Sequence, residues 1–127
     1  MDTEEMGAEI VFEHRAVIFN VNVSAPTGAG VYEAVQAAWR INPRRASMAE
    51  LVLAQVQGVV VGVFLPSQWL PATEENFPNR PRDERTDKRW GFVGLDAPPE
   101  IARIYMEKRL PATMRKRGSA NPVRYSY

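Results

Sequence analysis

The chain contains no cysteine and a single histidine, His14, among its 127 residues. Without cysteine, disulfides, thiolate metal ligands and thiol nucleophiles are excluded, and a reducing compartment fits this composition. One histidine cannot build a histidine metal cluster, and a serine triad would have to recruit His14. The longest apolar run, Val59–Leu65, is interrupted by Gly62 and is too short to span a bilayer. We therefore expect a cytoplasmic protein with no metal, no cofactor and no membrane partner.

The sequence also contains no complete motif for nucleotide hydrolysis. Gly28–Gly30 precedes a predicted helix, as a phosphate cradle would, but the lysine and the serine or threonine that complete a P-loop are absent. The carboxylate pairs Glu74 with Glu75 and Asp83 with Glu84 fall in a polar segment, where solvated charge is the ordinary role and magnesium binding is the alternative. The sequence assigns no catalytic residue, and it favours a binding protein over an enzyme.

The charge is distributed unevenly along a chain of ordinary globular composition. Hydrophobic residues make up 45% and charged residues 24%, which predicts one domain. Residues 1–14 hold five acids and no lysine or arginine, residues 15–102 hold nine of each sign, and residues 103–127 hold seven basic residues against one acid. We interpret residues 1–14 as an acidic, flexible leader and residues 15–127 as the domain. The basic end is either an ordinary solvated surface or a contact for a polyanion.

Hydrophobic periodicity and breaker residues predict the elements. We expect a strand over Ala16–Val23, a helix over Val31–Trp39, a hairpin of Leu51–Gln57 and Val59–Leu65 around Gly58, a strand over Arg89–Leu95, a helix from Pro99 to Arg109, and a closing strand over Asn121–Tyr127. A polar, basic connection follows Pro43, and Pro66–Arg89 is predicted as a long surface loop at the rim of a site. Gly62 predicts a bulge or tight bend.

This order of elements does not alternate as in a doubly wound parallel sheet. It predicts an α+β fold: a small, mostly antiparallel curved sheet or β-barrel with two or three flanking helices.

Aromatic residues stand beside basic ones in several parts of the chain. Aromatic faces stack nucleobases, and arginine makes bidentate contacts to phosphates and base edges. The alternative for each tryptophan is a place in the core. The candidate ligand-binding residues are Trp39, Arg40, Arg44, Arg45, Trp69, Lys88, Arg89, Arg115, Lys116, Arg117, Asn121, Arg124 and Tyr125.

Four blocks of these residues carry a family resemblance over about residues 30–127. The blocks are Val31–Ala34 with Trp39–Ile41 and Arg45–Ala46, the hairpin with Gly58, Arg89–Gly94, and Gly118 with Asn121–Tyr125. Together they resemble a family of small uncharacterised bacterial proteins and C-terminal modules whose element order is similar to the PUA-like folds, the group of EVE, ASCH and YTH domains. The resemblance implies a small barrel with a pocket for a nucleotide or modified base, and it carries over no catalytic residue. The chain departs from the family at Gln36 and Ala38, where the family often has an arginine and an aromatic residue.

The leading hypothesis is a non-catalytic module that binds nucleic acid or a modified nucleotide. Trp39 and Trp69 would stack a base, the arginines at 40, 44 and 45 would line the mouth of the pocket, and those at 115, 117 and 124 would hold phosphates. Two alternatives stay open: a protein-interaction partner in a toxin–antitoxin or restriction-type system, and a metal-independent ribonuclease that uses Glu33, Arg40, Lys88 or Tyr125.

Overall fold

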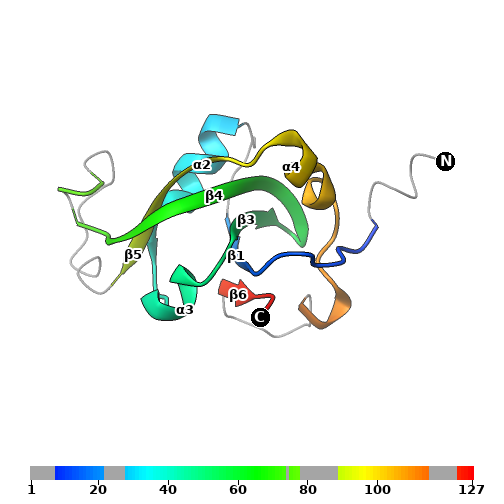
Figure 1. The fold of residues 1–127 in the computed structure, drawn as a ribbon, viewed down its shortest axis with the longest axis horizontal. Coiled ribbons are helices and arrows are strands. Elements are labelled where there is room, and N and C mark those ends of the chain that lie inside the picture. The colour runs from blue at the N-terminus through cyan, green and yellow to red at the C-terminus, as the bar shows by residue number, and fades with distance from the viewer. Residues whose placement is uncertain (1–7, 22–27, 74, 78–88, 115–122) are drawn as a thin grey trace.

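A computed structural model describes residues 8–21, 28–73, 75–77, 89–114 and 123–127. Its elements are β1 (Ala16–Asn20), α2 (Gly28–Gln36), β2 (Ala37–Trp39), α3 (Pro43–Ser47), β3 (Leu51–Val56), β4 (Val59–Pro71), β5 (Trp90–Asp96), α4 (Pro99–Tyr105), the 3-10 turn η2 (Ala112–Met114) and β6 (Val123–Tyr125). The α+β class is therefore confirmed, with three short α-helices in the described part of the chain (Figure 1).

The strands form one six-stranded sheet in the order β2-β5-β4-β3-β1-β6. Within the described residues, β1 and β3 pair in parallel, and the other four pairings between strands are antiparallel. The predicted mostly antiparallel sheet is thus confirmed. Strand β1 lies between β3 and the last strand, β6, so that the first and last strands of the chain are neighbours in the sheet (Figure 1).

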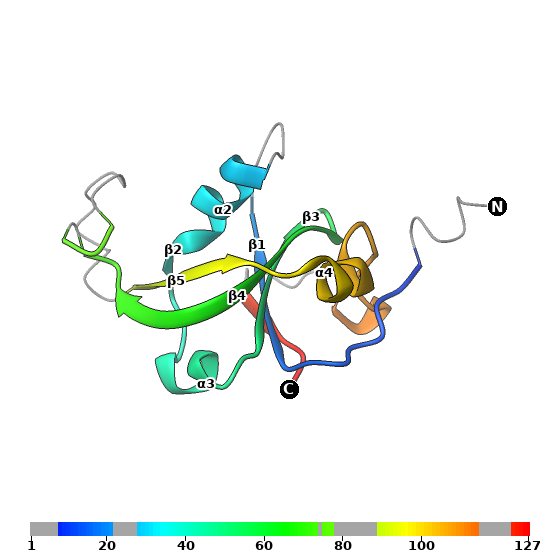
Figure 2. The same ribbon diagram turned by 45° about the horizontal axis from the view of Figure 1, so that its top comes forward.

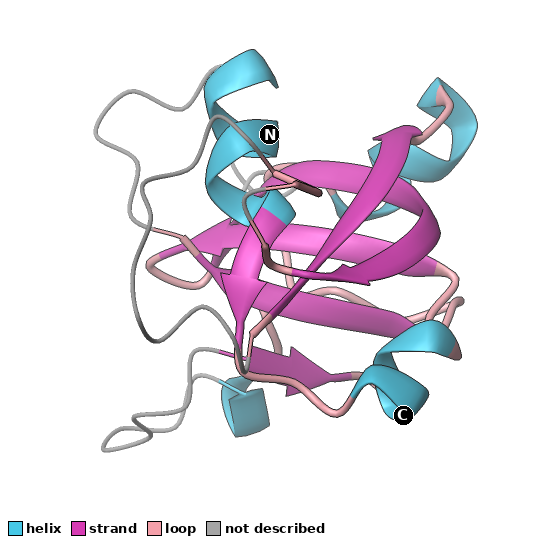
Figure 3. Ribbon diagram, turned by 90° about the vertical axis from the view of Figure 1, so that its left-hand side faces the viewer, coloured by secondary structure: helices cyan, strands magenta, loops and turns pink. Residues whose placement is uncertain are grey.

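The sheet is strongly curved but not closed. The rings of Phe19 in β1 and Trp39 in β2 stack with centroids 4.5 Å apart, although β5, β4 and β3 lie between these two strands in the sheet order. The sheet must curl to bring them together, and Figure 3 shows the strands wrapping around a common centre. The edge strands β2 and β6 form no ladder with each other within the described residues. The barrel alternative of the sequence prediction is therefore wrong, because no backbone ladder joins the described residues of β2 and β6.

The predicted hairpin of β3 and β4 is confirmed, and its turn explains the loop sequence. Gln57 and Gly58 both have positive φ, 52° and 85°, as the two central residues of a type I′ turn require. The register shifts by one residue opposite Ala54 and Gln55, next to Gly62, which confirms the predicted bulge. A Cβ on Gly62 would lie 2.7 Å from Cγ1 of Val31, so the missing side chain also lets α2 pack closely on β4.

The predicted loop at Pro66–Arg89 is wrong at its start, because β4 continues to Pro71. Pro66 pairs with Gly94 of β5, and the register shifts between Pro66 and Gln68, at the kind of irregularity where a strand tolerates proline. Trp69 is then placed opposite Phe92 in the ladder. The proline-rich composition suggested a loop, whereas the pairing with β5 stabilises an extended chain.

Helix boundaries differ from the prediction in three places. Helix α2 ends at Gln36, and Trp39 belongs to the short edge strand β2. The predicted connection after Pro43 contains α3, whose N-cap Asn42 accepts hydrogen bonds from the backbone of Arg44 and Arg45. Helix α4 ends at Tyr105, before the lysine and arginine that were expected in its last turn.

The two faces of the sheet carry two separate hydrophobic clusters. We call the first the aliphatic side; its buried members are Ile10, Ala16, Ile18, Leu51, Leu53, Val60, Val63, Ala97, Tyr105 and Leu110. We call the second the aromatic side; its buried members are Val17, Phe19, Val21, Val31, Val35, Val52, Ala54, Phe64, Phe92 and Val123. Helix α4 covers the aliphatic side and α2 covers part of the aromatic side (Figure 2).

The segment 8–14, which the sequence analysis assigned to the leader, packs on the aliphatic side. Ile10 is buried and its N–H donates to the carbonyl of Arg109 at 2.9 Å. The hydroxyl of Tyr105 accepts the N–H of Glu13 at 2.9 Å and lies 2.8 Å from Nδ1 of His14. Burial raises the pKa of Tyr105 above its ordinary value.

Candidate nucleic-acid interface

Trp39 and Trp69, which come from β2 and β4, meet on the same buried ring. Phe19 stacks on Trp39 and lies 6.3 Å from Trp69, centroid to centroid, while Trp69 also contacts Phe92 at 5.4 Å. The indole N–H of Trp39 donates to the carbonyl of Val35 in α2 at 2.8 Å. Phe19 is fully buried, whereas both tryptophans are only partly buried. The two indoles are therefore held in place on the aromatic side and retain accessible surface.

The segment directly after Trp39 is basic and exposed. It runs from Arg40 to Arg45, contains three arginines and no acid, and all three arginines are exposed. Asn42 caps α3 and fixes the backbone at Arg44 and Arg45. Within the part of the chain that the structure describes, neither Arg40 nor Arg44 has an ion-pair partner. These two guanidinium groups can therefore bind an anion without first breaking an ion pair.

Arg45 is engaged with the C-terminal strand. Its guanidinium lies 4.1 Å above the ring centre of Tyr125 and 5.6 Å from that of Tyr127, and it donates to the carbonyl oxygen of Tyr127. The hydroxyl of Tyr127 in turn donates to the carbonyl of Arg45. These contacts join α3 to β6 across the open edge of the sheet. We call this surface, Trp39, Arg40, Arg44, Arg45, Tyr125 and Tyr127, the β2–β6 seam.

The two seam tyrosines are held in the neutral form. Burial is the largest cause that raises the pKa of Tyr125, and the charge of Arg45 opposes it. Burial, followed by the neighbouring Tyr125, raises the pKa of Tyr127. Both hydroxyls therefore stay protonated at neutral pH and can donate hydrogen bonds.

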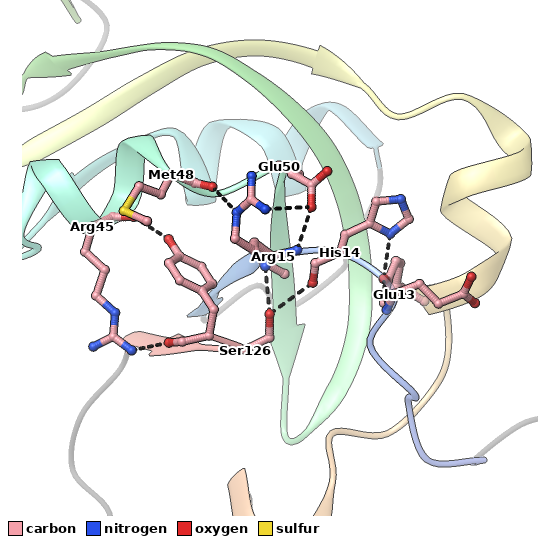
Figure 4. A network of polar contacts seen from close by, with 10 residues as sticks. Glu13, His14, Arg15, Arg45, Met48, Glu50 and Ser126 are labelled. Carbon is pink, nitrogen blue, oxygen red and sulfur yellow. Dashed lines mark hydrogen bonds and ion pairs between the residues drawn. The ribbon is translucent and has the colours of Figure 1, made fainter.

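A polar network fastens the start of β1 and the end of the chain to α3 (Figure 4). The backbone N–H of Arg15 donates to Oε1 of Glu50 at 3.0 Å, and the two side chains form an exposed ion pair at 3.9 Å. Ser126 Oγ accepts the N–H of Ala16 at 2.8 Å and donates to the carbonyl of His14 at 3.1 Å. The hydrogen bond from Arg15 lowers the pKa of Glu50. This network positions the end of β6, and with it the seam tyrosines.

The structure brings Arg45 into contact with Tyr125 and places both Trp39 and Trp69 against Phe19, while Arg40 and Arg44 lie near these residues along the chain. Trp39, Arg40, Arg44, Arg45 and Tyr125 belong to the seam, and Trp69 reaches it through its contact with Phe19. Arg89 precedes Trp90, the register partner of Trp39, and so lies at the same end of the β2–β5 ladder as Arg40.

Arg124 does not belong to this group. In the register of β6 with β1, Arg124 is opposite Ile18, whose side chain packs on the aliphatic side, while Tyr125 is opposite Val17 of the aromatic side. Neighbouring residues of a strand face opposite ways, so Arg124 and Tyr125 cannot bind the same small ligand. The predicted role of Arg124 in holding phosphates therefore stays a prediction for a surface on the other side of the sheet from Tyr125.

The other predicted binding residues, Lys88, Arg115, Lys116, Arg117 and Asn121, lie outside the described residues. Lys88 and the side chain of Glu33, both candidates for a ribonuclease centre, are likewise outside what the structure describes.

Sequence reasoning missed Phe19, Asn42 and Tyr127 as parts of the site. Phe19 looked like any inward residue of a strand, and only the curvature of the sheet places it under two tryptophans. The dipeptide Asn42–Pro43 carried a usable signal, because asparagine followed by proline is a common start of a helix.

Among the described residues, no three potential metal ligands gather in one place, and no helix combines the length and hydrophobicity needed to cross a membrane. Comparison with protein-family models, with curated proteins and with solved structures found no match to this chain. The resemblance to PUA-like domains therefore stays a prediction from the four sequence blocks.

Proposed function

We propose that the protein binds single-stranded nucleic acid or a nucleotide at the β2–β6 seam. One observation carries the proposal: Trp39 and Trp69, both only partly buried, meet on Phe19 from separate strands, and the exposed arginines 40 and 44 follow Trp39 directly in the chain. Aromatic stacking combined with unpaired arginines is the usual means of binding unpaired bases and their phosphates. The resemblance to PUA-like domains points to the same ligand class.

The residues of the seam divide into two roles. Arg40 and Arg44 contact phosphates, since their side chains are exposed and lack carboxylate partners in the described residues. Arg45 holds α3 against β6 through the two tyrosines and is a positioning residue. The indoles of Trp39 and Trp69, fixed from below by Phe19, offer stacking surface to a base.

The test is a fluorescence anisotropy titration of labelled single-stranded and double-stranded DNA and RNA at several salt concentrations. We expect salt-dependent binding of single strands. Arg40→Ala and Arg44→Ala should each weaken it and reduce the slope of log affinity against log salt by about 0.7 for each lost phosphate contact.

Arg103→Ala is the matched control. Arg103 is an exposed arginine of α4, which packs on the aliphatic side, so its replacement changes the net charge equally at a distant place. An equal loss of affinity in all three variants would indicate a general charge effect and contradict the seam. If the unmodified protein binds no nucleic acid even at low salt, the proposal is wrong and a protein partner becomes the favoured ligand.

A further inference from the structure

A third tryptophan, Trp90 of β5, lies next to the two that the proposed function uses. In the sheet order β2-β5-β4, strand β5 stands between the strands that carry Trp39 and Trp69. Trp90 is the register partner of Trp39 in the β2–β5 ladder. Residues directly opposite each other in antiparallel strands have Cβ atoms about 4.5–5.5 Å apart. Trp90 is therefore an immediate neighbour of Trp39.

Trp90 also takes the same face of the sheet as the other two tryptophans. It stands two residues before Phe92, whose ring is buried on the aromatic side, and side chains two positions apart in a strand share a face. The ladder between β4 and β5 is regular here, with Trp69 opposite Phe92 and Pro71 opposite Trp90. Three adjacent strands thus each contribute one tryptophan to the aromatic side.

Unlike its neighbours, Trp90 is not used for packing within the described residues. Its side chain packs against none of their hydrophobic clusters, makes no ring contact with another of them, and is only partly buried. Its indole N–H has no partner among these residues, which contain no buried side-chain nitrogen without one, so solvent reaches this nitrogen. By contrast, Trp39 stacks on Phe19 and its indole N–H donates to the carbonyl of Val35. A core role does not explain a tryptophan at position 90.

Resting on the proposed function, we infer that Trp90 is a third stacking residue and that the ligand is a single strand of at least three nucleotides, not a free nucleotide. Neighbouring strands lie about 4.8 Å apart, so one indole from each of three strands gives a row of flat faces along which successive bases can stack. Aromatic side chains on neighbouring strands of an open sheet are a known means of stacking two or three bases of a single strand.

The experiment measures affinity as a function of strand length. Unlabelled oligothymidylates of one to six nucleotides compete with a longer labelled strand in the anisotropy assay. We expect the affinity of the unmodified protein to rise by roughly 5- to 150-fold with each added nucleotide up to the third, the range for one stacked base, and by much less after that.

Trp90→Leu removes the flat ring but keeps an apolar side chain in the strand. It should weaken binding of the trinucleotide by roughly 5- to 150-fold and leave that of the single nucleotide nearly unchanged, because Trp39 and Trp69 remain. Trp90→Phe keeps a flat face and should retain most of the affinity for the trinucleotide. Val93→Ala is the control, because Val93 is an exposed residue of β5 on the opposite face, and the length dependence should stay unchanged.

The length dependence separates stacking from a general loss of structure, which would weaken the single nucleotide as well. Equal affinity of the unmodified protein for one and for three nucleotides, or a length dependence that survives Trp90→Leu, would overturn this inference and leave the proposed function standing. The same holds if Trp90→Phe loses as much affinity for the trinucleotide as Trp90→Leu. Absence of binding to every oligonucleotide would overturn both.

Discussion

The aliphatic and aromatic sides are built from the same strands, yet they differ in how completely they are covered. In β1, the neighbouring residues Ile18 and Phe19 point to opposite sides. Ile18 lies under segment 8–14 and α4 in a cluster of mainly aliphatic side chains. Phe19 lies under two tryptophans that are themselves only partly buried. Segment 8–14 and α4 cover the aliphatic side, whereas the aromatic side ends in tryptophan rings that are only partly buried, so a ligand is expected on the aromatic side.

Phe19→Ala should produce the largest effect, because it removes the shared support of Trp39 and Trp69. A fully buried phenylalanine replaced by alanine costs about 3–5 kcal/mol of unfolding free energy. Chemical denaturation followed by tryptophan fluorescence would measure it. Leu95→Ala, at a side chain 75% exposed, is the control and should change the unfolding free energy by less than about 0.5 kcal/mol. Similar losses for both variants would contradict the assignment of Phe19 to the core.

Tyr105→Phe tests the corresponding support on the aliphatic side. It keeps the ring but leaves the N–H of Glu13 and Nδ1 of His14 without their partner, which should cost about 1–3 kcal/mol. Hydrogen exchange should show faster exchange at Ile10 and Glu13, while amides of α2 keep their protection. Equal loss of protection on both sides would mean that segment 8–14 is not held separately by Tyr105.

Arg45→Met tests the seam with a smaller expected effect. Methionine preserves much of the packing of the arginine stem but removes the charge above Tyr125, and exposed cation–π contacts contribute about 0.5–1 kcal/mol. Thermal unfolding of this variant and of Arg44→Met, at a neighbouring arginine without such a contact, would measure the difference. Equal stability of the two variants would show that the seam contact contributes nothing.

The smallest effect concerns pH, because the seam tyrosines are partly exposed and solvent screens their interactions. The pKa values of Tyr125 and Tyr127 are raised above the ordinary 10.0 in the folded state. As pH rises, the unfolded chain therefore loses these protons first. The stability linked to the neutral tyrosines is complete below pH 10 and is lost as pH rises through the higher folded values.

Unfolding measured across this alkaline range should show stability falling with pH. The fall should be shallower in Tyr125→Phe, which has one fewer group with a raised pKa. An unchanged slope in this variant would contradict the burial of Tyr125 in the seam.

Much of the fold could be predicted from local patterns. The hairpin followed from two apolar runs separated by Gln57 and Gly58, because the turn residues and the alternation agree. Strand β4 was predicted too short, since the composition after Pro66 is that of a loop and only the pairing with β5 stabilises the extended chain there. Helix α3 was missed because five residues carry too little periodicity to be recognised.

The candidate site could be predicted only in part. Trp39, Trp69 and the arginines 40 and 44 were identified because stacking and phosphate binding require these residue types. That Arg124 and Tyr125 take opposite faces of β6 could not be predicted, since proximity in sequence does not show which face a side chain takes until the register is known.

The sequence by itself determined the α+β class, the hairpin and the residue types available for binding, because these depend on composition and on periodicity within short segments. Only the tertiary structure decided that the sheet curls without closing and that Phe19 supports two tryptophans. It also decided that the guanidinium of Arg45 lies against the rings of the C-terminal tyrosines, whereas Arg40 and Arg44 have no ion-pair partner in the described residues. These outcomes depend on the register and curvature of strands far apart in the chain, which no local pattern encodes.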